Sequence, residues 1–178
     1  GVVNIVCGRG NTVGAPLVAQ PEVAMISLTG SIASGEKVLS AAVNGTKRTH
    51  LELGGKAPVI VFDDADLEEV VSGVRTFGFY NAGQDCTAAC RIYAAPKIHD
   101  RLVADLSAAA SSIKMGAQEE EGVELGPLIT AKHRSRVAGF VERANQKRHI
   151  EIVTGGKPRA GSGFFYEPTV IAGAKQTD

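Results

Sequence analysis

The sequence has no excess of charge of either sign and no long apolar run. Lys and Arg together number 19 among the 178 residues, as do Asp and Glu, so the formal net charge is +0. Surfaces that bind nucleic acids or anionic membranes need a basic excess, and a membrane-spanning helix needs about 20 consecutive apolar residues. We therefore expect neither a nucleic acid nor a membrane as a partner.

Cysteine is also scarce: Cys7, Cys86 and Cys90 are the three examples. An odd, sparse set does not form a disulfide framework, which indicates a reducing compartment such as the cytoplasm. Cys86 and Cys90 do not have the C-x-x-C spacing of a zinc or redox pair, and no histidine lies at ligand spacing from a cysteine, so we expect no metal site. The start of the chain lacks both a Met and a signal-peptide pattern, and we expect an internal segment of a longer protein.

The residues that are present predict a folded α/β protein. Hydrophobic residues make up 44% of the chain and charged residues 21%, which is enough apolar surface for a core. Apolar runs bounded by Gly or Pro predict strands, and capped segments with one apolar face predict helices. The predicted strands are residues 2–6, 23–28, 49–53, 59–62, 91–95 and 150–153, and the predicted helices are residues 15–20, 34–43, 67–83, 99–115 and 131–148. This alternation favours parallel sheets.

The strand–helix rhythm restarts near Gly55–Pro58, which predicts a domain boundary there. Residues 1–56 then hold three strands, too few for a complete doubly wound nucleotide-binding sheet. We expect residues 1–56 to be the C-terminal part of a nucleotide-binding domain and residues 57–178 to be an incomplete second domain that carries the thiol chemistry.

The run Gly83-Gln84-Asp85-Cys86-Thr87 places a cysteine among small residues just past a predicted helix. Burial as a small hydrophobe is the commonest alternative for a free cysteine. Small neighbours, however, let a carbonyl group approach the sulfur, and the following backbone N–H groups can face a developing oxyanion. We interpret Cys86 as a candidate nucleophile that forms an acyl intermediate, and Cys7 and Cys90 as packing residues.

The run Leu51–Lys56 places the Glu52 carboxylate at a strand end beside Gly54 and Gly55. Its spacing alone fits a solvent-facing glutamate at least as well as a functional one. The glycines favour function, because they let a ligand approach the backbone closely. We interpret Glu52 as a candidate general base that activates water to release the acyl group.

Two glycine patterns indicate a phosphate or nucleotide site. Thr29-Gly30-Ser31-x-x-x-Gly35 follows a strand and opens a helix, so its N–H groups and the Ser31 hydroxyl can hold a phosphate; an ordinary N-cap turn is the alternative. Gly8-Arg9-Gly10-x-x-x-Gly14 approximates a dinucleotide fingerprint, but its last gap is one residue too long and no acidic residue follows at the expected distance.

The order of these motifs resembles the aldehyde dehydrogenase superfamily. Its GxG, TGSxxxG, LELGGK, GQxC, GPL and PTV motifs match Gly8–Gly10, Thr29–Gly35, Leu51–Lys56, Gly83–Cys86, Gly126–Leu128 and Pro168–Val170. The resemblance covers essentially all 178 residues, and the run Asn81–Arg91 is similar to γ-aminobutyraldehyde dehydrogenases, which are relatives of betaine aldehyde dehydrogenases. It implies an α/β fold in which a partial Rossmann-type nucleotide-binding sheet precedes most of an α/β catalytic domain.

The resemblance also implies a reaction, the oxidation of an aldehyde to a carboxylate with NAD, or NADP, as cofactor. Cys86 would attack the aldehyde to form a thiohemiacetal and then a thioester, and Glu52 would activate the hydrolytic water. The implied cofactor-binding residues are Gly10, Gly14, Gly30, Ser31, Leu53 and Gly54. An aminoaldehyde such as 4-aminobutyraldehyde is the implied substrate, and a homo-oligomer, either dimer or tetramer, is the implied assembly.

Two other classes of function compete with this interpretation. A cysteine acyl-transferase or hydrolase needs a histidine base, and the four histidines form no local motif with Cys86. A catalytically silent nucleotide-binding module would keep Gly30 and Ser31 but would have no use for Cys86 or Glu52. A CoA-acylating dehydrogenase normally lacks the hydrolytic glutamate, so Glu52 counts against it.

We predict that residues 1–178 by themselves form no NADH from an aldehyde. The resemblance places the family's oxyanion asparagine and its adenosine-ribose ligands before Gly1, and its EIFGP motif after Asp178. An absorbance assay of the purified segment with NAD and a panel of aldehydes checks this expectation, and turnover in that assay would contradict it.

Overall fold

The computed structural model describes residues 1–178 and divides into two compact units, Gly1–Gly55 and Lys56–Asp178. The division falls inside the Leu51–Lys56 run, one residue before the boundary expected after residue 56. No helix in either unit combines the length and the apolar composition needed to cross a membrane.

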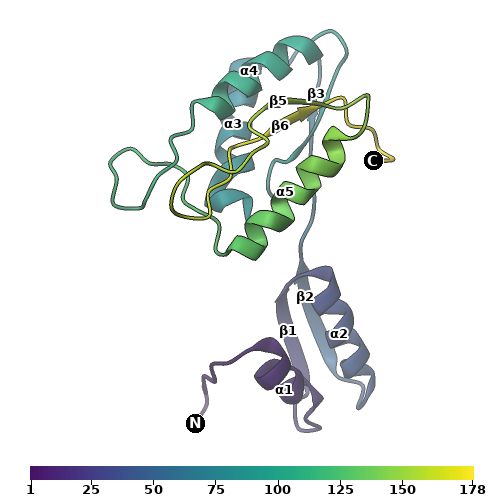
Figure 1. Ribbon diagram of the computed structural model, residues 1–178. Coiled ribbons are helices and arrows are strands. Elements are labelled where there is room, and N and C mark those ends of the chain that lie inside the picture. Colours follow the sequence, from purple (N-terminus) through teal and green to yellow (C-terminus); the bar gives the residue numbers. More distant parts are fainter. The chain divides into compact units, whose positions relative to one another are not determined.

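The first unit is a pair of parallel strands covered by helices (Figure 1). Its elements are η1 (Gly10–Gly14), α1 (Ala15–Ala19), β1 (Met25–Gly30), α2 (Ile32–Val43) and β2 (Arg48–Leu53). Ile26 of β1 and Val38 and Ala42 of α2 form the buried core. Strands β1 and β2 run in register from Met25 opposite Arg48 to Gly30 opposite Leu53, so both strands end at one edge of the sheet.

The predicted strand over residues 2–6 is wrong. These residues form no regular element, and Val2 and Ile5 are 103% and 86% exposed. An apolar run becomes a strand only when another strand accepts its backbone hydrogen bonds, and β1 and β2 pair only with each other. The Gly8–Gly14 pattern therefore follows no strand and instead leads into a π-helical turn, η1.

The second unit contains a parallel pair of strands, an antiparallel pair of strands, three α-helices and a short 3-10 helix (Figure 1). Its elements are β3 (Pro58–Val61), α3 (Leu67–Phe79), η2 (Tyr80–Gly83), β4 (Arg91–Ala94), α4 (His99–Ser111), α5 (Ala131–Asn145), β5 (Glu151–Thr154) and β6 (Val170–Ala172). Strands β3 and β4 are parallel, whereas β5 and β6 are antiparallel with an irregularity between Ile152 and Thr154.

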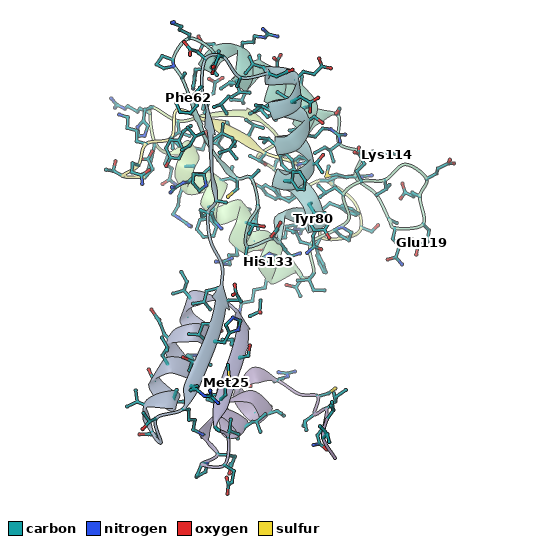
Figure 2. The ribbon with its side chains drawn as sticks, turned by 180° about the vertical axis from the view of Figure 1, so that it is seen from behind. Met25, Phe62, Tyr80, Lys114, Glu119 and His133 are labelled. Atoms are coloured by element: carbon teal, nitrogen blue, oxygen red, sulfur yellow. The ribbon has the colours of Figure 1, made fainter.

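The core of this unit lies between the β3–β4 pair and two helices. Val61 of β3 packs with Leu67 and Val74 of α3 and with Leu102 and Leu106 of α4, and all five are buried. The alternate positions of β3 point the other way: Ile60 is 65% exposed and Phe62, just past the strand, is 67% exposed (Figure 2). One face of β3 therefore holds α3 and α4 in place.

Helix α4 ends earlier than predicted, at Ser111 rather than Met115. The carbonyl of Lys114 accepts hydrogen bonds from the N–H groups of Glu124 and Leu125, and Met115 bridges to Leu125, so this backbone pairs across a loop instead of continuing the helix. Figure 2 shows Lys114 at the base of that loop and Glu119 at its far end. Helix α5 also ends three residues earlier than predicted, at Asn145, and β6 was not predicted as a strand.

We predict that Asp66→Ala destabilises the protein, because Asp66 caps α3. Its Oδ1 accepts hydrogen bonds from the N–H groups of Glu68 at 3.0 Å and Glu69 at 3.4 Å. Loss of such a cap costs about 0.5–2 kcal/mol of unfolding free energy, which urea unfolding measures. Asp64→Ala is the matched control, since it removes the same charge two residues earlier from a side chain without a hydrogen bond. Equal stability of the two variants would contradict the capping role.

Candidate active site

A left-handed turn connects α3 to the Cys86 loop. Asn81, Ala82 and Gly83 have φ values of 50°, 56° and 75° in succession. Glycine adopts this region freely and asparagine tolerates it, but Ala82 does so at a cost of roughly 1 kcal/mol. Tyr80 marks the end of α3 in Figure 2. The turn stops the helix and redirects the chain just before the cysteine.

Asn81 and Gln84 hold this turn closed from both ends. Asn81 Nδ2 donates to the Gln84 carbonyl at 3.0 Å, and Gln84 Nε2 donates to the Asn81 carbonyl at 3.3 Å. The Gln84 backbone N–H also donates to the Asn81 carbonyl, at 3.2 Å. Gln84 is therefore part of the turn that precedes Cys86, a role that its position in the sequence did not indicate.

Asp85 organises the residues that follow. Its Oδ1 accepts hydrogen bonds from the backbone N–H and the hydroxyl of Thr87, each at 2.9 Å. The Thr87 N–H, then the Thr87 hydroxyl and to a smaller extent the Cys86 thiol lower the pKa of the Asp85 carboxyl below its ordinary value by hydrogen bonding. Asp85 is therefore ionised at neutral pH and acts only as an acceptor.

The loop is attached to α3 on its far side as well. Ala88 is buried at 5% exposure, and the Ala89 N–H donates to the Phe77 carbonyl at 3.3 Å. Gly78 permits this approach, since a Cβ there would lie 3.0 Å from the Ala89 oxygen. Cys86 itself is exposed. The structure thus presents the thiol to solvent from a loop that is tied to α3 before and after it.

The two other cysteines differ from expectation. Cys7 and Cys90 were predicted to be packing residues, but both are exposed. Cys7 lies in the segment that forms no strand, so no sheet covers it, and Cys90 immediately precedes β4. Exposure therefore does not distinguish Cys86 from the other two cysteines. The hydrogen-bonded loop around Cys86 does.

Three motifs that are far apart in the sequence meet beside the Cys86 loop. A hollow of about 210 Å³ is lined by Gly83, by Gly126 and Leu128 of the GPL run, and by Pro168 and Thr169 of the PTV run. Tyr166 and Val141 contribute to the same wall. The GPL and PTV runs therefore lie against the turn that precedes Cys86, a proximity that motif order alone does not reveal.

Glu52 lies near the end of β2 in the first unit. Its side chain is 62% exposed, and His50 Nε2 lies 3.4 Å from Glu52 Oε1, an ion pair when the imidazole is protonated. Ser27 Oγ lies 3.1 Å from His50 Nδ1. His50 and Glu52 alternate with Leu51 along the strand, so both side chains occupy one face of β2. Glu52 and Cys86 belong to different units, and their joint action on a substrate stays a prediction.

Four of the predicted cofactor residues come together in the first unit. Gly30 and Leu53 are opposite one another at the carboxyl ends of β1 and β2, and Ser31 and Gly54 follow directly. The crevice beyond the carboxyl ends of parallel strands is the usual ligand position in open α/β sheets. Gly10 and Gly14 lie instead in η1, and no atom would lie within 4 Å of a Cβ built on either of them.

The α2 N-terminus stands at the same edge. Ser31 caps α2, its Oγ accepting from the Ser34 N–H at 3.2 Å and lying 3.0 Å from the Ser34 hydroxyl. Gly35 is buried against Leu53, where a Cβ would lie 2.8 Å from Leu53 Cδ1. These contacts bring the first turn of α2 against Leu53. A helix N-terminus with N–H groups at a strand edge fits an anionic diphosphate.

Arg75 and Glu124 form an ion pair that the sequence analysis missed. The guanidinium contacts both carboxylate oxygens: Arg75 Nη2 lies 2.8 Å from Glu124 Oε1, and Arg75 Nη1 lies 2.7 Å from Glu124 Oε2. The pair joins α3 to the segment before α5 and lines a hollow of about 310 Å³ with Phe79, Tyr80 and Asn81. Nothing in the local sequence connects residues 49 positions apart. The pair restrains the helix whose end carries the Cys86 loop.

The comparisons with known proteins agree on one family. The model of the Aldehyde dehydrogenase family matches residues 1–178. Lactaldehyde dehydrogenase of Escherichia coli K12 is 41% identical over 177 residues, which are 99% of this chain and 37% of the relative. Betaine aldehyde dehydrogenase of Bacillus subtilis 168 is 43% identical over 176 residues, which are 97% of this chain and 36% of the relative. The chain thus spans little more than a third of these relatives.

Solved structures give the same result. The crystal structure of E. coli lactaldehyde dehydrogenase superposes with a TM-score of 0.89 at 41% identity, covering 93% of this chain and 35% of that one. Betaine aldehyde dehydrogenase of Staphylococcus aureus in complex with NAD+ superposes with a TM-score of 0.92 at 34% identity, covering 97% and 35%. The expected α/β fold, a part of the fold of these enzymes, is confirmed.

We predict that the Arg75–Glu124 pair contributes its full stability above about pH 4.5 and loses it as the pH falls through the lowered pKa of Glu124. The hydrogen bond from Arg75, and then the Lys114 N–H, lower the pKa of Glu124 below its ordinary value of 4.5. A lowered folded-state pKa adds stability above the unfolded-state pKa, and this stability is lost as the pH falls through the folded value. Glu124→Gln should therefore cost about 0.2–1 kcal/mol at pH 7, given the partial exposure of the pair, and nothing once Glu124 is protonated.

Urea unfolding at neutral and acidic pH measures this difference, with Glu121→Gln as a control at a side chain that makes no hydrogen bond. A cost that does not depend on pH would contradict the ion-pair explanation.

Proposed function

This chain belongs to the aldehyde dehydrogenase family, and on that premise we propose that it supplies the nucleophile and the general base for NAD-dependent oxidation of an aldehyde to a carboxylate. The observation that carries the proposal is the Cys86 loop: an exposed thiol held between a closed left-handed turn and the Asp85–Thr87 hydrogen bonds. The chain covers little more than a third of its relatives, so the complete activity is proposed for the protein that carries it.

In this proposal the Cys86 thiolate attacks the aldehyde carbon to form a thiohemiacetal. The Cys86 backbone N–H stabilises the resulting oxyanion, which is where a preorganised donor lowers the barrier most. NAD+ supplies the acceptor for the hydride that leaves this carbon, so that Cys86 then carries a thioester. Cys86 thus divides one oxidation into two easier steps.

Glu52 completes the reaction by releasing the acyl group. Its carboxylate takes a proton from water as the oxygen attacks the thioester carbon, the C–S bond breaks, and the carboxylate product leaves. Exposure of the Glu52 side chain at 62% supports access of water to this base. The hydrolytic step distinguishes the proposal from acyl transfer to CoA, which needs no such base.

The residues at the carboxyl ends of β1 and β2 fit a dinucleotide. We propose that Gly30 and Ser31, at the α2 N-terminus, contact the pyrophosphate, and that Leu53 and Gly54 lie near the nicotinamide carboxamide. Support comes from the register that pairs Gly30 with Leu53 and from the packing of Gly35 on Leu53. Gly10 and Gly14 are proposed for the cofactor on the motif alone.

We propose an aminoaldehyde such as 4-aminobutyraldehyde as the substrate, on the similarity of the run Asn81–Arg91 to γ-aminobutyraldehyde dehydrogenases. The similar proteins are named for lactaldehyde and for betaine aldehyde, so they support an aldehyde as the substrate class. The amino group of the substrate is proposed on the Asn81–Arg91 run alone. The family resemblance and the sparse cysteines further support a cytoplasmic homo-oligomer as the complete protein.

We predict that the two catalytic variants differ in the NADH burst: Cys86→Ala loses it and Glu52→Gln keeps it. In the full-length protein, Cys86→Ala should lower NADH formation more than about a thousandfold, because no acyl intermediate forms. Glu52→Gln should give a burst of NADH close to one per active site and then a steady state slowed by about 10²–10⁴-fold, because acylation survives while deacylation does not. Stopped-flow absorbance with an aminoaldehyde and NAD measures both phases.

Cys90→Ala and Glu22→Gln are the matched controls, each removing an exposed side chain of the same type, and both should keep the burst and the steady state. Turnover by Cys86→Ala at the wild-type rate would contradict the role of Cys86 as the nucleophile. An unchanged steady-state rate in Glu52→Gln would contradict the role of Glu52 as the general base. Without a burst or a dependence on NAD, a thiol acyl-transferase or a silent nucleotide-binding module becomes the better description.

A further inference from the structure

We propose that Asp85 is a positioning residue for Cys86: its carboxylate holds the nucleophile's backbone in the one conformation that aims the thiol at a bound aldehyde. The inference rests on the proposed function and adds a residue to it. Asp85 does not touch the substrate in this proposal and acts through Cys86 and Thr87.

The geometry places Asp85 at the centre of the loop. One oxygen, Oδ1, receives both the N–H and the hydroxyl of Thr87 at 2.9 Å, and the Asp85 carbonyl receives the Ala88 N–H at 3.3 Å. Cys86 lies in the chain between Asp85, which accepts these bonds, and Thr87 and Ala88, which donate them, so the bonds restrain the backbone dihedral angles of Cys86.

Contacts that do not involve Asp85 hold the loop on both sides of the Cys86–Thr87 segment. The conformation of this segment therefore depends on Asp85. Upstream, Asn81 and Gln84 exchange side-chain-to-backbone hydrogen bonds. Downstream, Ala88 is buried and Ala89 bonds to Phe77 of α3. Between these anchors, the side-chain hydrogen bonds are the two that Asp85 accepts from Thr87, the residue that follows Cys86.

A charge effect and a positioning effect of Asp85 have opposite signs. A carboxylate beside a thiol opposes thiolate formation, so loss of its charge alone would make Cys86 more reactive toward any electrophile. Loss of the Asp85 hydrogen bonds would instead leave the thiol reactive but poorly aimed at a bound substrate, and a misplacement of about 1 Å can cost roughly 100-fold in rate. Asparagine retains a carbonyl oxygen that can accept the same two bonds without the charge.

The test compares Asp85→Ala, Asp85→Asn and Thr87→Val in the full-length protein. Thermal unfolding establishes that each variant is folded. Stopped-flow measurement of the NADH burst with the aldehyde and NAD reports the rate of acylation. Iodoacetamide alkylation, located at Cys86 by mass spectrometry, reports the reactivity of the thiol toward a small reagent that needs no positioning.

We expect Asp85→Ala to slow the burst about 10- to 100-fold with KM for the aldehyde changed less than about threefold, while alkylation is as fast as in wild type or faster. Asp85→Asn should restore the burst to within about threefold of wild type. Thr87→Val keeps the backbone donor and loses the hydroxyl, so its burst should lie between those of wild type and Asp85→Ala; it also serves as the informative variant if Asp85→Ala does not fold.

Three results would overturn the inference: a wild-type burst in Asp85→Ala, a burst as slow in Asp85→Asn as in Asp85→Ala, or an alkylation rate that falls in parallel with the burst. Cys86→Ala separates this inference from the proposed function. If Cys86→Ala still forms NADH, the proposed mechanism fails whatever Asp85 does; if it is inactive and Asp85→Ala is normal, only the positioning role fails.

Discussion

The structure of the second unit depends on the burial of one face of β3 by α3 and α4. Val61, Leu67, Val74, Leu102 and Leu106 form that contact, and burying a side chain of this size contributes about 1.5–3 kcal/mol. Packing along this seam holds α3 against the sheet, and the left-handed turn after Phe79 ends the helix. The left-handed turn, the Cys86 loop and the ion pair of Arg75 all take their positions from that helix.

The candidate site uses backbone geometry more than unusual side-chain environments. In the first unit, the parallel register of β1 and β2 brings Gly30, Ser31, Leu53 and Gly54 to one edge, beside the N-terminus of α2. In the second unit, a turn of positive φ and a short set of hydrogen bonds expose one thiol. Both arrangements present N–H groups and small residues, which suit a long, flexible cofactor and a reacting carbonyl that must approach the main chain closely.

Family membership and local structure support each other at the motifs. The family model matches residues 1–178 and so covers every one of these motifs. The structure brings these motifs together: Gly83, the GPL run and the PTV run line one hollow although neighbouring motifs are 40 or more positions apart along the chain. Each of these runs is recognisable in the sequence, but the contact between them comes from folding.

Some sequence-based expectations failed, and the failures have a common cause. The apolar run at residues 2–6 has the composition of a strand and no partner strand, so it forms no regular element and is exposed. Met115 has the periodicity of α4 but pairs with Leu125 instead, and β6 becomes a strand because β5 lies beside it. Cys7 and Cys90 were expected to be packed, yet burial depends on neighbours that a local pattern does not contain.

What the sequence determined by itself was local: the caps at Ser31 and Asp66, the helical and strand periodicities, the glycines that permit close approach, and the motifs that identify the family. These follow from interactions over a few residues, whose physics is the same in any fold. Tertiary structure alone decided which strands pair, that Met115 pairs with Leu125 beyond the end of α4, and that Arg75 meets Glu124. Such contacts depend on the closure of long loops and on burial, and neither is encoded at any single position.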